Sequence, residues 1–260
     1  MVMKKYVKDL MIAAVEFPHE CYVLLKLTDS EPLPEMLPGQ FVEVKVEGSP
    51  KTFLRRPISI NYVDRENNQL WLLIKKVGEG TQKLAELKVG DKLNLVFPLG
   101  NGFSSVQEKG EKVLLVGGGV GVAPLLDYGK YLKDNGASPV FLLGARSKSD
   151  LLEQALFKAI APVYVTTEDG SEGEKGFVTQ HTLLEKERFD RISVCGPKPM
   201  MMSVARYAKA TGTPCEVSLE NMMACGLGAC LCCVEKTVKG NVCVCKEGPV
   251  FDINDLTWNI

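Results

Sequence analysis

Residues 113–124 read VLLVGGGVGVAP, an apolar run that passes directly into a glycine-rich stretch and then a proline. The apolar run is typical of a buried strand, and Pro124 suits the first turn of a helix, where its missing N–H costs little. A glycine loop between a strand and a helix lets a pyrophosphate approach the backbone and the positive end of the helix dipole. We therefore predict nucleotide binding at Gly118, Gly119 and Gly121, with a plain tight turn as the alternative.

The chain beyond this loop alternates extended and helical segments. The expected strands are Val140–Leu143, Val163–Thr166, Ile192–Cys195 and Cys215–Leu219. Three helices are expected between and after them. The first ends near Gly136, the second is Leu151–Ile160 with Ser149-Asp150 as its N-cap, and the third is Lys198–Lys209, which ends before Gly212. Such alternation predicts a doubly wound parallel sheet. We assign it to residues 104–219, with the polar stretch Ser104–Glu111 as the hinge.

A second candidate site lies at the same, carboxyl, edge of this sheet. Cys195 and Gly196 end one expected strand, and a small thiol there is suited to lie against a nicotinamide ring. A buried small residue that closes the strand is the alternative. The acidic residue that usually ends the second strand of a dinucleotide-binding fold is absent, since Gly144-Ala145-Arg146 stands there. The choice between NAD and NADP therefore stays open.

The first hundred residues show a different pattern, that of short strands with one short helix. The expected strands are Cys21–Thr28, Phe41–Glu47, Pro57–Tyr62, Leu70–Val77 and Lys92–Phe97, and the expected helix is Thr81–Leu87. Phe41–Glu47 alternates apolar and charged residues, as a strand with one buried face does. Short strands at this spacing favour an antiparallel barrel. We assign residues 1–103 to this domain.

Two motifs of the barrel are suited to a flavin dinucleotide. Arg56 begins the stretch Arg56-Pro57-Ile58-Ser59, where the guanidinium is suited to bind a diphosphate and the Ser59 hydroxyl to lie near a flavin ring. Gly80-Thr81, at the start of the short helix, offers a second anion site. Taken singly, Arg56 is more often a surface arginine.

The last 41 residues, 220–260, are rich in glycine and cysteine, and we assign them to a small third domain. Cys225, Cys230 and Cys233 are spaced C-x4-C-x2-C, with Cys245 twelve positions after the third, as in plant-type [2Fe–2S] ferredoxins. A zinc knuckle or buried small cysteines are the alternatives, but zinc sites favour paired C-x2-C units and often a histidine, and neither histidine is near in sequence. Cys243 competes with Cys245 as the fourth ligand. We prefer Cys245 because a turn follows it.

Composition bounds the function further. The chain has 260 residues, a formal net charge of -1 and nine cysteines, an odd number that argues against a secreted disulfide framework. No basic field directs it to nucleic acid or an anionic membrane. The apolar runs are too short for a signal peptide or a membrane span, so we expect a cytoplasmic protein. No base or nucleophile constellation for a separate substrate appears, so we assign no catalytic residue.

The order of these motifs resembles the ferredoxin reductase superfamily and, more narrowly, the electron transfer subunit family of NAD-linked dihydroorotate dehydrogenases. The resemblance covers nearly the whole chain. Its most specific parts are Arg56–Ser59, Glu168–Ser171 with Gly176–Thr179, and Cys225–Phe251.

The resemblance implies FAD bound in the barrel and NAD as electron acceptor in the second domain. The implied flavin contacts are Arg56, Pro57, Ile58, Ser59, Leu73, Ile74, Lys75, Gly80 and Thr81. The superfamily has an aromatic residue where Ile58 stands. The resemblance also implies a catalytic partner that carries FMN and oxidises dihydroorotate in pyrimidine biosynthesis, in a heterotetramer of two plus two subunits. The tail Pro249–Ile260 packs either on that partner or on its own chain.

The rival functions are an NAD(P)H-oxidising subunit of a transhydrogenase, hydrogenase or sulfur reductase, and a zinc-binding interaction module without flavin. The Pro-Ile-Ser stretch favours the dihydroorotate dehydrogenase family over the first. A one-electron cluster beside a two-electron flavin indicates that this protein exchanges electrons with another protein.

Overall fold

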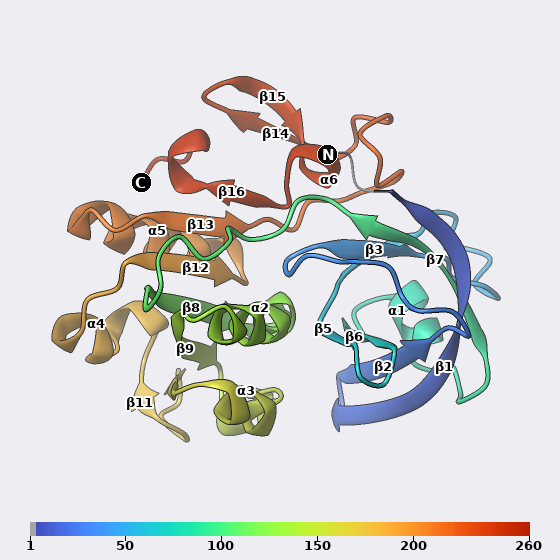
Figure 1. Cartoon of the computed structure of the whole chain (residues 1–260), viewed down its shortest axis with the longest axis horizontal. Coiled ribbons are helices and arrows are strands. Elements are labelled where there is room, and N and C mark those ends of the chain that lie inside the picture. Colours follow the sequence, from blue (N-terminus) through green and yellow to red (C-terminus); the bar gives the residue numbers. More distant parts are fainter. Residues whose placement is uncertain (1–3) are drawn as a thin grey trace. The chain divides into compact units, whose positions relative to one another are not determined.

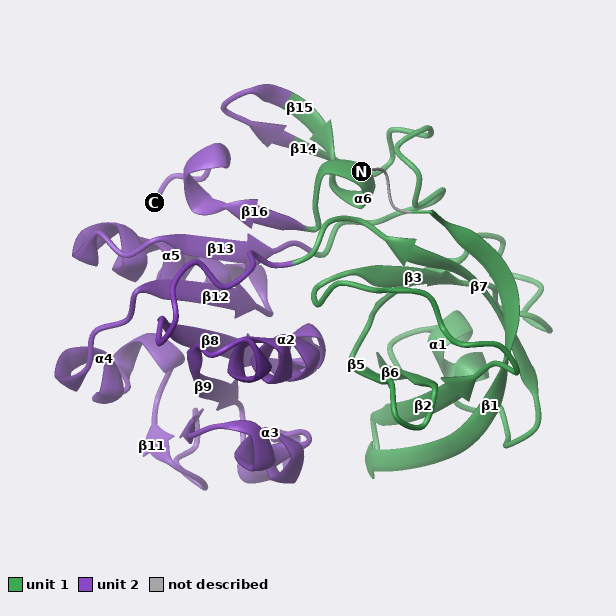
Figure 2. Ribbon diagram, viewed as in Figure 1, with its two compact units in different colours: residues 1–102, 220–235, 241–249 green, residues 103–219, 236–240, 250–260 purple. Residues whose placement is uncertain are grey.

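The computed structural model describes residues 4–260, which divide into two compact units (Figure 2). Unit 1 holds the chain up to Gly102 with residues 220–235 and 241–249, and unit 2 holds residues 103–219, 236–240 and 250–260. The cysteine-rich segment therefore contributes to both units. None of the helices among residues 4–260 combines the length and the apolar character that a membrane crossing requires.

Unit 1 is built on a seven-stranded antiparallel sheet that curls around its own core (Figure 1). In spatial order its strands are β4 (Arg56–Ser59), β3 (Phe41–Val44), β7 (Lys92–Leu99), β1 (Tyr6–His19), β2 (Tyr22–Thr28), β6 (Gln69–Lys75) and β5 (Tyr62–Asp64). The short helix α1 (Glu79–Leu84) follows β6. Leucine, isoleucine and valine side chains from all of these strands except β4 fill the core, with the half-buried Ile58 of β4 packed against it. The predicted antiparallel flavin-type barrel is confirmed.

Three local expectations in this unit were wrong. The sequence pattern gave no strand for β1, because its exposed positions include the apolar Val7 and Met11, so that polar and apolar residues do not alternate, and its pairing with β2 contains register shifts. The expected strand Pro57–Tyr62 is two strands, β4 and β5. The strand expected over Phe41–Glu47 ends at Val44, and all four of its residues are buried, so neither face is open to solvent.

Unit 2 contains the predicted parallel sheet. Its spatial order is β11 (Glu174–Lys175), β10 (Val163–Thr167), β9 (Ser138–Ala145), β8 (Lys112–Gly118), β12 (Arg191–Cys195), β13 (Cys215–Ser218) and β16 (Val250–Asp252), with helices α2 (Ala123–Asp134), α3 (Gln154–Ile160), α4 (Leu183–Lys186) and α5 (Lys198–Thr211). The step from β8 to β9 runs opposite to the step from β12 to β13. Right-handed crossovers then place α2 and α5 on opposite faces, which is the doubly wound arrangement.

The helix boundaries agree with the sequence at α5 and differ at α3. Gly212, with φ of 69°, ends α5 as expected of a left-handed C-cap. Helix α3 starts at Gln154, after Glu153 in a left-handed conformation, and not at Leu151. The Asp150 carboxylate instead accepts from the backbone and hydroxyl of Ser147, which closes a short 3-10 turn before the helix.

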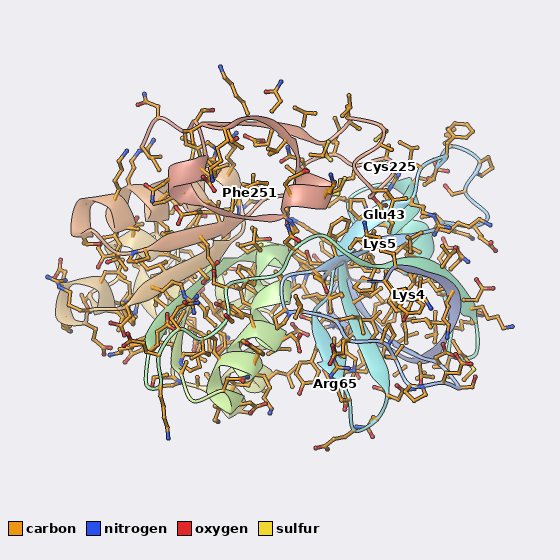
Figure 3. The ribbon with its side chains drawn as sticks, turned by 45° about the horizontal axis from the view of Figure 1, so that its top comes forward. Lys4, Lys5, Glu43, Arg65, Cys225 and Phe251 are labelled. Carbon is orange, nitrogen blue, oxygen red and sulfur yellow. The ribbon has the colours of Figure 1, made fainter. Side chains whose placement is uncertain are left out.

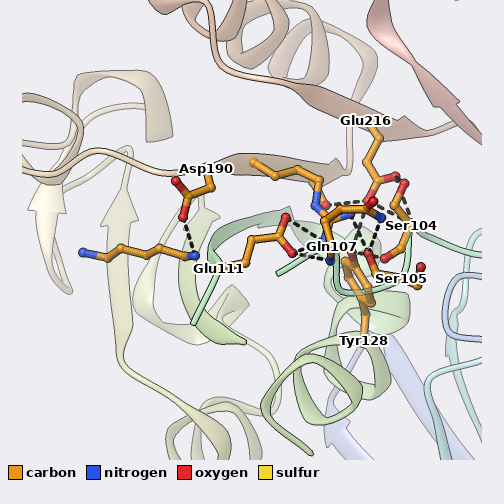
Figure 4. Close-up of polar contacts among 10 residues, drawn as sticks. Ser104, Ser105, Gln107, Glu111, Tyr128, Asp190 and Glu216 are labelled. Atoms are coloured by element: carbon orange, nitrogen blue, oxygen red, sulfur yellow. Dashed lines mark hydrogen bonds and ion pairs between the residues drawn. The ribbon is translucent and has the colours of Figure 1, made fainter. Parts of the chain in front are cut away.

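The segment Ser104–Glu111 is fastened to the sheet of unit 2 (Figure 4). The backbone and hydroxyl of Ser104 donate to the Glu216 carboxylate at 3.1 and 2.7 Å, and the Tyr128 hydroxyl donates to the Ser104 carbonyl at 2.8 Å. Arg191 donates to the Ser105 carbonyl and pairs with Glu111 at 3.2 Å. A segment held by so many bonds is a poor site for a hinge.

The C-terminal tail packs on its own chain. Strand β16 pairs antiparallel with β13, so that Phe251 lies opposite Val217, and both Phe251 and Leu256 are buried. The cysteine-rich segment before it contains a hairpin of β14 (Val234–Thr237) and β15 (Gly240–Cys243) and a single helical turn, α6 (Val244–Glu247).

Candidate functional site

The glycine loop connects β8 to α2 through a short 3-10 turn, Gly119–Val122. Gly119 has φ of 57°, a conformation that favours glycine. A Cβ on Gly121 would lie 2.5 Å from the Gly196 Cα and 2.6 Å from the Cys195 carbonyl carbon. The two predicted nucleotide loops are therefore in direct backbone contact at the carboxyl edge of the sheet, where β12 pairs with β8.

Met200, in the first turn of α5, lies over both loops. A Cβ on Gly118 would lie 2.7 Å from its Sδ, and one on Gly196 would lie 2.6 Å from its Cε. A methionine in a helix is usually a packing residue, and the packing surface of Met200 is the two glycine loops. The Cys195 side chain is buried.

The loops after β9 and β10 interlock at the same edge. The Lys148 backbone N–H donates to the Ser171 hydroxyl at 2.7 Å, and the Glu168 and Asp169 N–H groups donate to the Ala145 and Arg146 carbonyls. Two hydrogen bonds from Ser171 lower the pKa of the Asp169 carboxyl, so it stays ionised. The loop after β9 lacks the acidic residue that is usual in dinucleotide-binding folds, whereas the adjacent loop, which follows β10, carries Glu168 and Asp169.

In unit 1 the two predicted diphosphate motifs lie together. A Cβ on Gly80 would lie 3.1 Å from the Arg56 Nε and 3.0 Å from the Thr52 Cγ2, so the guanidinium rests against the start of α1. The Thr81 hydroxyl accepts from the Val77 and Gly78 N–H groups at 2.9 and 3.1 Å, and so it is used to shape the turn. Sequence order separates these motifs by some twenty residues, and the barrel brings them together.

The remaining predicted flavin contacts lie on two strands. Pro57, Ile58 and Ser59 form β4 with Arg56, and all four are half-buried. Leu73, Ile74 and Lys75 end β6, with the first two buried and Lys75 exposed. Their contacts with a flavin stay predictions.

The predicted cysteine ligands gather in one loop system of unit 1. Gly226 and Gly228 both have positive φ, 66° and 78°, which lets the loop curl as expected of it. Backbone N–H groups then point at sulfur: Leu227 donates to the Cys225 Sγ at 3.3 Å, and Gly228 to the Cys245 Sγ at 3.1 Å. Such donors stabilise anionic sulfur, as a cluster site requires.

The thiols influence one another. Burial raises the pKa of the Cys225 thiol, but hydrogen bonds from the Leu227, Cys230 and Ala229 backbone and from the Cys230 side chain outweigh it and bring the pKa down to about 6. Burial and a hydrogen bond to Cys233 raise the pKa of the Cys245 thiol to about 12. Two pairs result, Cys225 with Cys230 and Cys233 with Cys245.

The fourth position has a structural argument in favour of Cys245. The two candidates lie in different elements, since β15 ends at Cys243 and Cys245 lies in α6. The Cys245 backbone donates to the Cys233 Sγ at 3.4 Å and its own Sγ accepts from Gly228, whereas the Cys243 Sγ lies 3.8 Å from the Gly228 carbonyl. Cys232 is exposed.

The donor set fits an iron–sulfur cluster. Four cysteines in two contacting pairs, with loop N–H groups directed at sulfur, are the groups such a cluster needs. Within residues 4–260 no three His, Cys, Asp or Glu side chains meet around a point where one metal ion could bind.

One residue of this site was missed by the sequence analysis. Glu43 lies in β3 with no exposed surface, and neither carboxylate oxygen has a hydrogen-bond partner among the described residues. Burial raises the pKa of this carboxyl to about 7, with Arg55 and Arg56 acting against the rise and Cys225 adding to it. The alternating pattern of Phe41–Glu47 placed Glu43 on a solvent face, and no local signal could have shown the cysteine loop that covers it.

The fold and the site define a class, that of ferredoxin reductase-like oxidoreductases with an added iron–sulfur domain. Three family models match the chain in this order: an oxidoreductase FAD-binding domain at residues 20–103, an oxidoreductase NAD-binding domain at residues 115–206, and the iron–sulfur cluster binding domain of dihydroorotate dehydrogenase B at residues 220–257. Their order is the one predicted from the motifs.

Curated relatives narrow the class. The chain is 40% identical over 225 residues to the electron transfer subunit of dihydroorotate dehydrogenase B (NAD(+)) of Shouchella clausii, which covers 84% of this chain and 86% of that one. The Fusobacterium nucleatum subunit of the same name is 40% identical over 226 residues, with the same coverage. The chain therefore belongs to the family of dihydroorotate dehydrogenase B electron transfer subunits.

Solved structures agree with this fold. A chain of the NADH-dependent reduced ferredoxin-NADP oxidoreductase, studied for flavin-based electron bifurcation, superposes with a TM-score of 0.85 at 30% identity, over 96% of this chain and 90% of that one. The ferredoxin reductase of carbazole 1,9a-dioxygenase gives a TM-score of 0.69 at 23% identity, over 82% and 68% of the two chains, and shows the fold alone.

Proposed function

We propose that this protein passes electrons from the FMN of a dihydroorotate-oxidising partner through a [2Fe–2S] cluster and FAD to NAD+, in pyrimidine biosynthesis. The proposal is carried by the cysteine loop of unit 1, whose N–H groups point at sulfur. Gly226 of this loop packs against β3, and β3 pairs with β4, which holds predicted flavin contacts. Cluster ligands and flavin contacts in one compact unit suit electron transfer between the two groups.

The chain's own residues hold and orient these groups. We assign cluster binding to Cys225, Cys230, Cys233 and Cys245, and the flavin diphosphate to Arg56 with the start of α1. The FAD, when bound, supplies the two-electron chemistry that nicotinamide requires. The loops at Gly118–Gly121 and Cys195-Gly196 would hold the pyridine nucleotide at the carboxyl edge of the parallel sheet.

We infer the assembly from the relatives. Their name describes an electron transfer subunit, which implies a separate catalytic subunit. We propose that this chain binds such a partner in a heterotetramer of two plus two subunits, in the cytoplasm. Size determination of the co-expressed pair by light scattering tests the stoichiometry.

A second candidate is an NADH-oxidising subunit of a bifurcating complex, because a chain of the ferredoxin-NADP oxidoreductase superposes along nearly the whole length. The higher identity to the dihydroorotate dehydrogenase subunits, 40% against 30%, favours the first candidate.

Co-expression with an FMN-dependent dihydroorotate-oxidising subunit separates the candidates. We expect a brown complex that reduces NAD+ with dihydroorotate, and no NAD+ reduction when this chain is omitted. A complex that oxidises NADH but transfers no electrons from dihydroorotate would favour the second candidate.

A further inference from the structure

Glu43 is the buried acid for which the fold gives no structural reason. Its side chain has no exposed surface, and both carboxylate oxygens lack a hydrogen-bond partner among residues 4–260. Burial of a carboxyl group without a compensating bond is costly, so a residue that serves folding alone would be apolar here. Val42 and Val44, its neighbours in β3, are apolar and fully buried.

The Glu43 side chain lies directly beneath the turn that follows Cys225. A Cβ on Gly226 would lie 2.7 Å from the Glu43 Cγ and 3.3 Å from its Oε1. Gly226 therefore has no room for a side chain, and the carboxyl group occupies that space. Figure 3 shows Glu43 and Cys225 next to each other at this edge of the barrel.

The cations around Glu43 are engaged elsewhere. Arg55 donates to the backbone carbonyls of Glu43 and Asn94 and, at 2.5 Å, to the Asn94 side-chain oxygen. Arg56 donates to the Leu54 and Arg55 carbonyls. Both guanidinium groups influence the carboxyl through space, and neither forms a hydrogen bond with its oxygens. The Glu43 Oε1 lies 3.3 Å from the Cβ position of Gly226, so the carboxyl group faces the cysteine turn.

We propose that Glu43 is a positioning residue for the iron–sulfur centre, one that supports the Cys225–Gly226 turn from the barrel side and sets the polarity, and hence the reduction potential, beside the first cysteine ligand. The inference rests on the assignment of Cys225 as a ligand. Hydrogen bonds and charges near the sulfurs are main determinants of cluster potentials. An acceptor oxygen beside Cys225 disfavours the added electron, and a donor in its place favours it.

Glu43→Gln tests this in the full chain, because it keeps the shape and replaces one acceptor oxygen by a donor. Glu47→Gln is the control, since Glu47 is an exposed glutamate just beyond β3. In an EPR-monitored redox titration we expect the ratio of reduced to oxidised cluster at a fixed potential to rise about tenfold in E43Q, which for one electron is about 59 mV. We expect no such change in E47Q.

Two further variants keep the test decisive if E43Q binds no cluster. Glu43→Leu should melt no lower than the wild type as apoprotein, because it removes an unpaired buried carboxyl, while its cluster is shifted in potential or lost. Gly226→Ala forces a methyl group onto Glu43 and should lower iron content. Gly212→Ala carries the same backbone strain, φ 69° against 66°, with nothing near its Cβ, and should retain full iron.

The outcomes separate this inference from the function on which it rests. Wild-type protein without iron and sulfide would refute the cluster site itself. Full iron content with unshifted potentials in both E43Q and E43L would overturn the role of Glu43 alone. A fall in melting temperature of the E43L apoprotein, with an unchanged potential, would make Glu43 a structural residue.

Discussion

Cys225 and Cys230 form the more exposed of the two thiol pairs, and each is expected to bind iron. Replacement of either by alanine removes one of four ligands, so the cluster should be absent or strongly depleted while the flavin remains. Cys232→Ala is the matched control, because Cys232 is exposed and lies between two ligands in the sequence. Iron and sulfide analysis checks this, and full iron in C225A or C230A would refute the ligand assignment.

The low pKa of the Cys225 thiol should make its alkylation depend on pH in cluster-free protein. Its pKa is lowered to about 6 from an ordinary value near 9, so the thiolate predominates above pH 6. Alkylation of Cys225 by iodoacetamide should therefore be half-maximal near pH 6 and should slow as pH falls further. Cys215 is the internal control, since burial raises its pKa and protects it. Mass spectrometry of the labelled peptides measures both.

Arg56 tests the flavin site. Arg56→Ala removes the guanidinium that rests against Gly80, and flavin occupancy after purification should fall severalfold because a charge-assisted diphosphate contact is lost. Arg65→Ala, an exposed arginine of the same unit, should leave the ratio of flavin to protein unchanged. Equal flavin content in both variants would count against the site.

Individual residues were predictable where their chemistry is encoded by spacing. The C-x4-C-x2-C run and the glycine loop needed no tertiary information. Glu43 and the contact of Met200 with Gly118 could not be found in this way, because Gly226 and Gly118 lie far away in sequence from these residues. A local pattern shows which residue types are adjacent in the chain but not what covers them.

At the scale of elements, the glycine loop and the Cys195–Gly196 loop are in close backbone contact. Gly121→Ala places a methyl group 2.5–2.6 Å from backbone atoms that have little room to move. We expect a loss of about 1–3 kcal/mol of stability and slower flavin reduction by NADH. Gly78→Ala, with ordinary φ and nothing within 4 Å of its Cβ, is the stability control. Thermal melting and stopped-flow reduction measure the two effects.

Strands were predicted well where their own sequence pattern is strong, and poorly where pairing with a neighbouring strand decides whether a segment is extended. The strands β8 and β9 contain apolar runs typical of buried strands, and β10, β12 and β13, which also carry polar residues, were predicted from their alternation with helical stretches. Strand β16 has three residues and exists because β13 offers it an edge, and β1 contains bulges and carries apolar residues at exposed positions as well. No sequence window of either contains that information.

At the scale of the whole molecule, Glu216 joins the start of unit 2 to its sheet. Its carboxylate accepts from Ser104 and Ser193 and lies 3.3 Å from the Tyr128 hydroxyl, which donates to the Ser104 carbonyl, and all three residues are in unit 2. Glu216→Gln leaves part of this buried network unsatisfied and should cost about 1–3 kcal/mol. The exposed Glu108→Gln should cost nothing measurable, and a melting temperature of E216Q equal to that of E108Q would contradict the role of this network.

The path of the chain between the units has a consequence for dissection of the protein. It crosses from one unit to the other after residues 102, 219, 235, 240 and 249. A gene fragment that stops at Leu219 would deprive the barrel of its cysteine loop and the parallel sheet of its last strand at once. The iron–sulfur segment is therefore not a detachable module, and a recombination event that exchanged it would have to respect both units together.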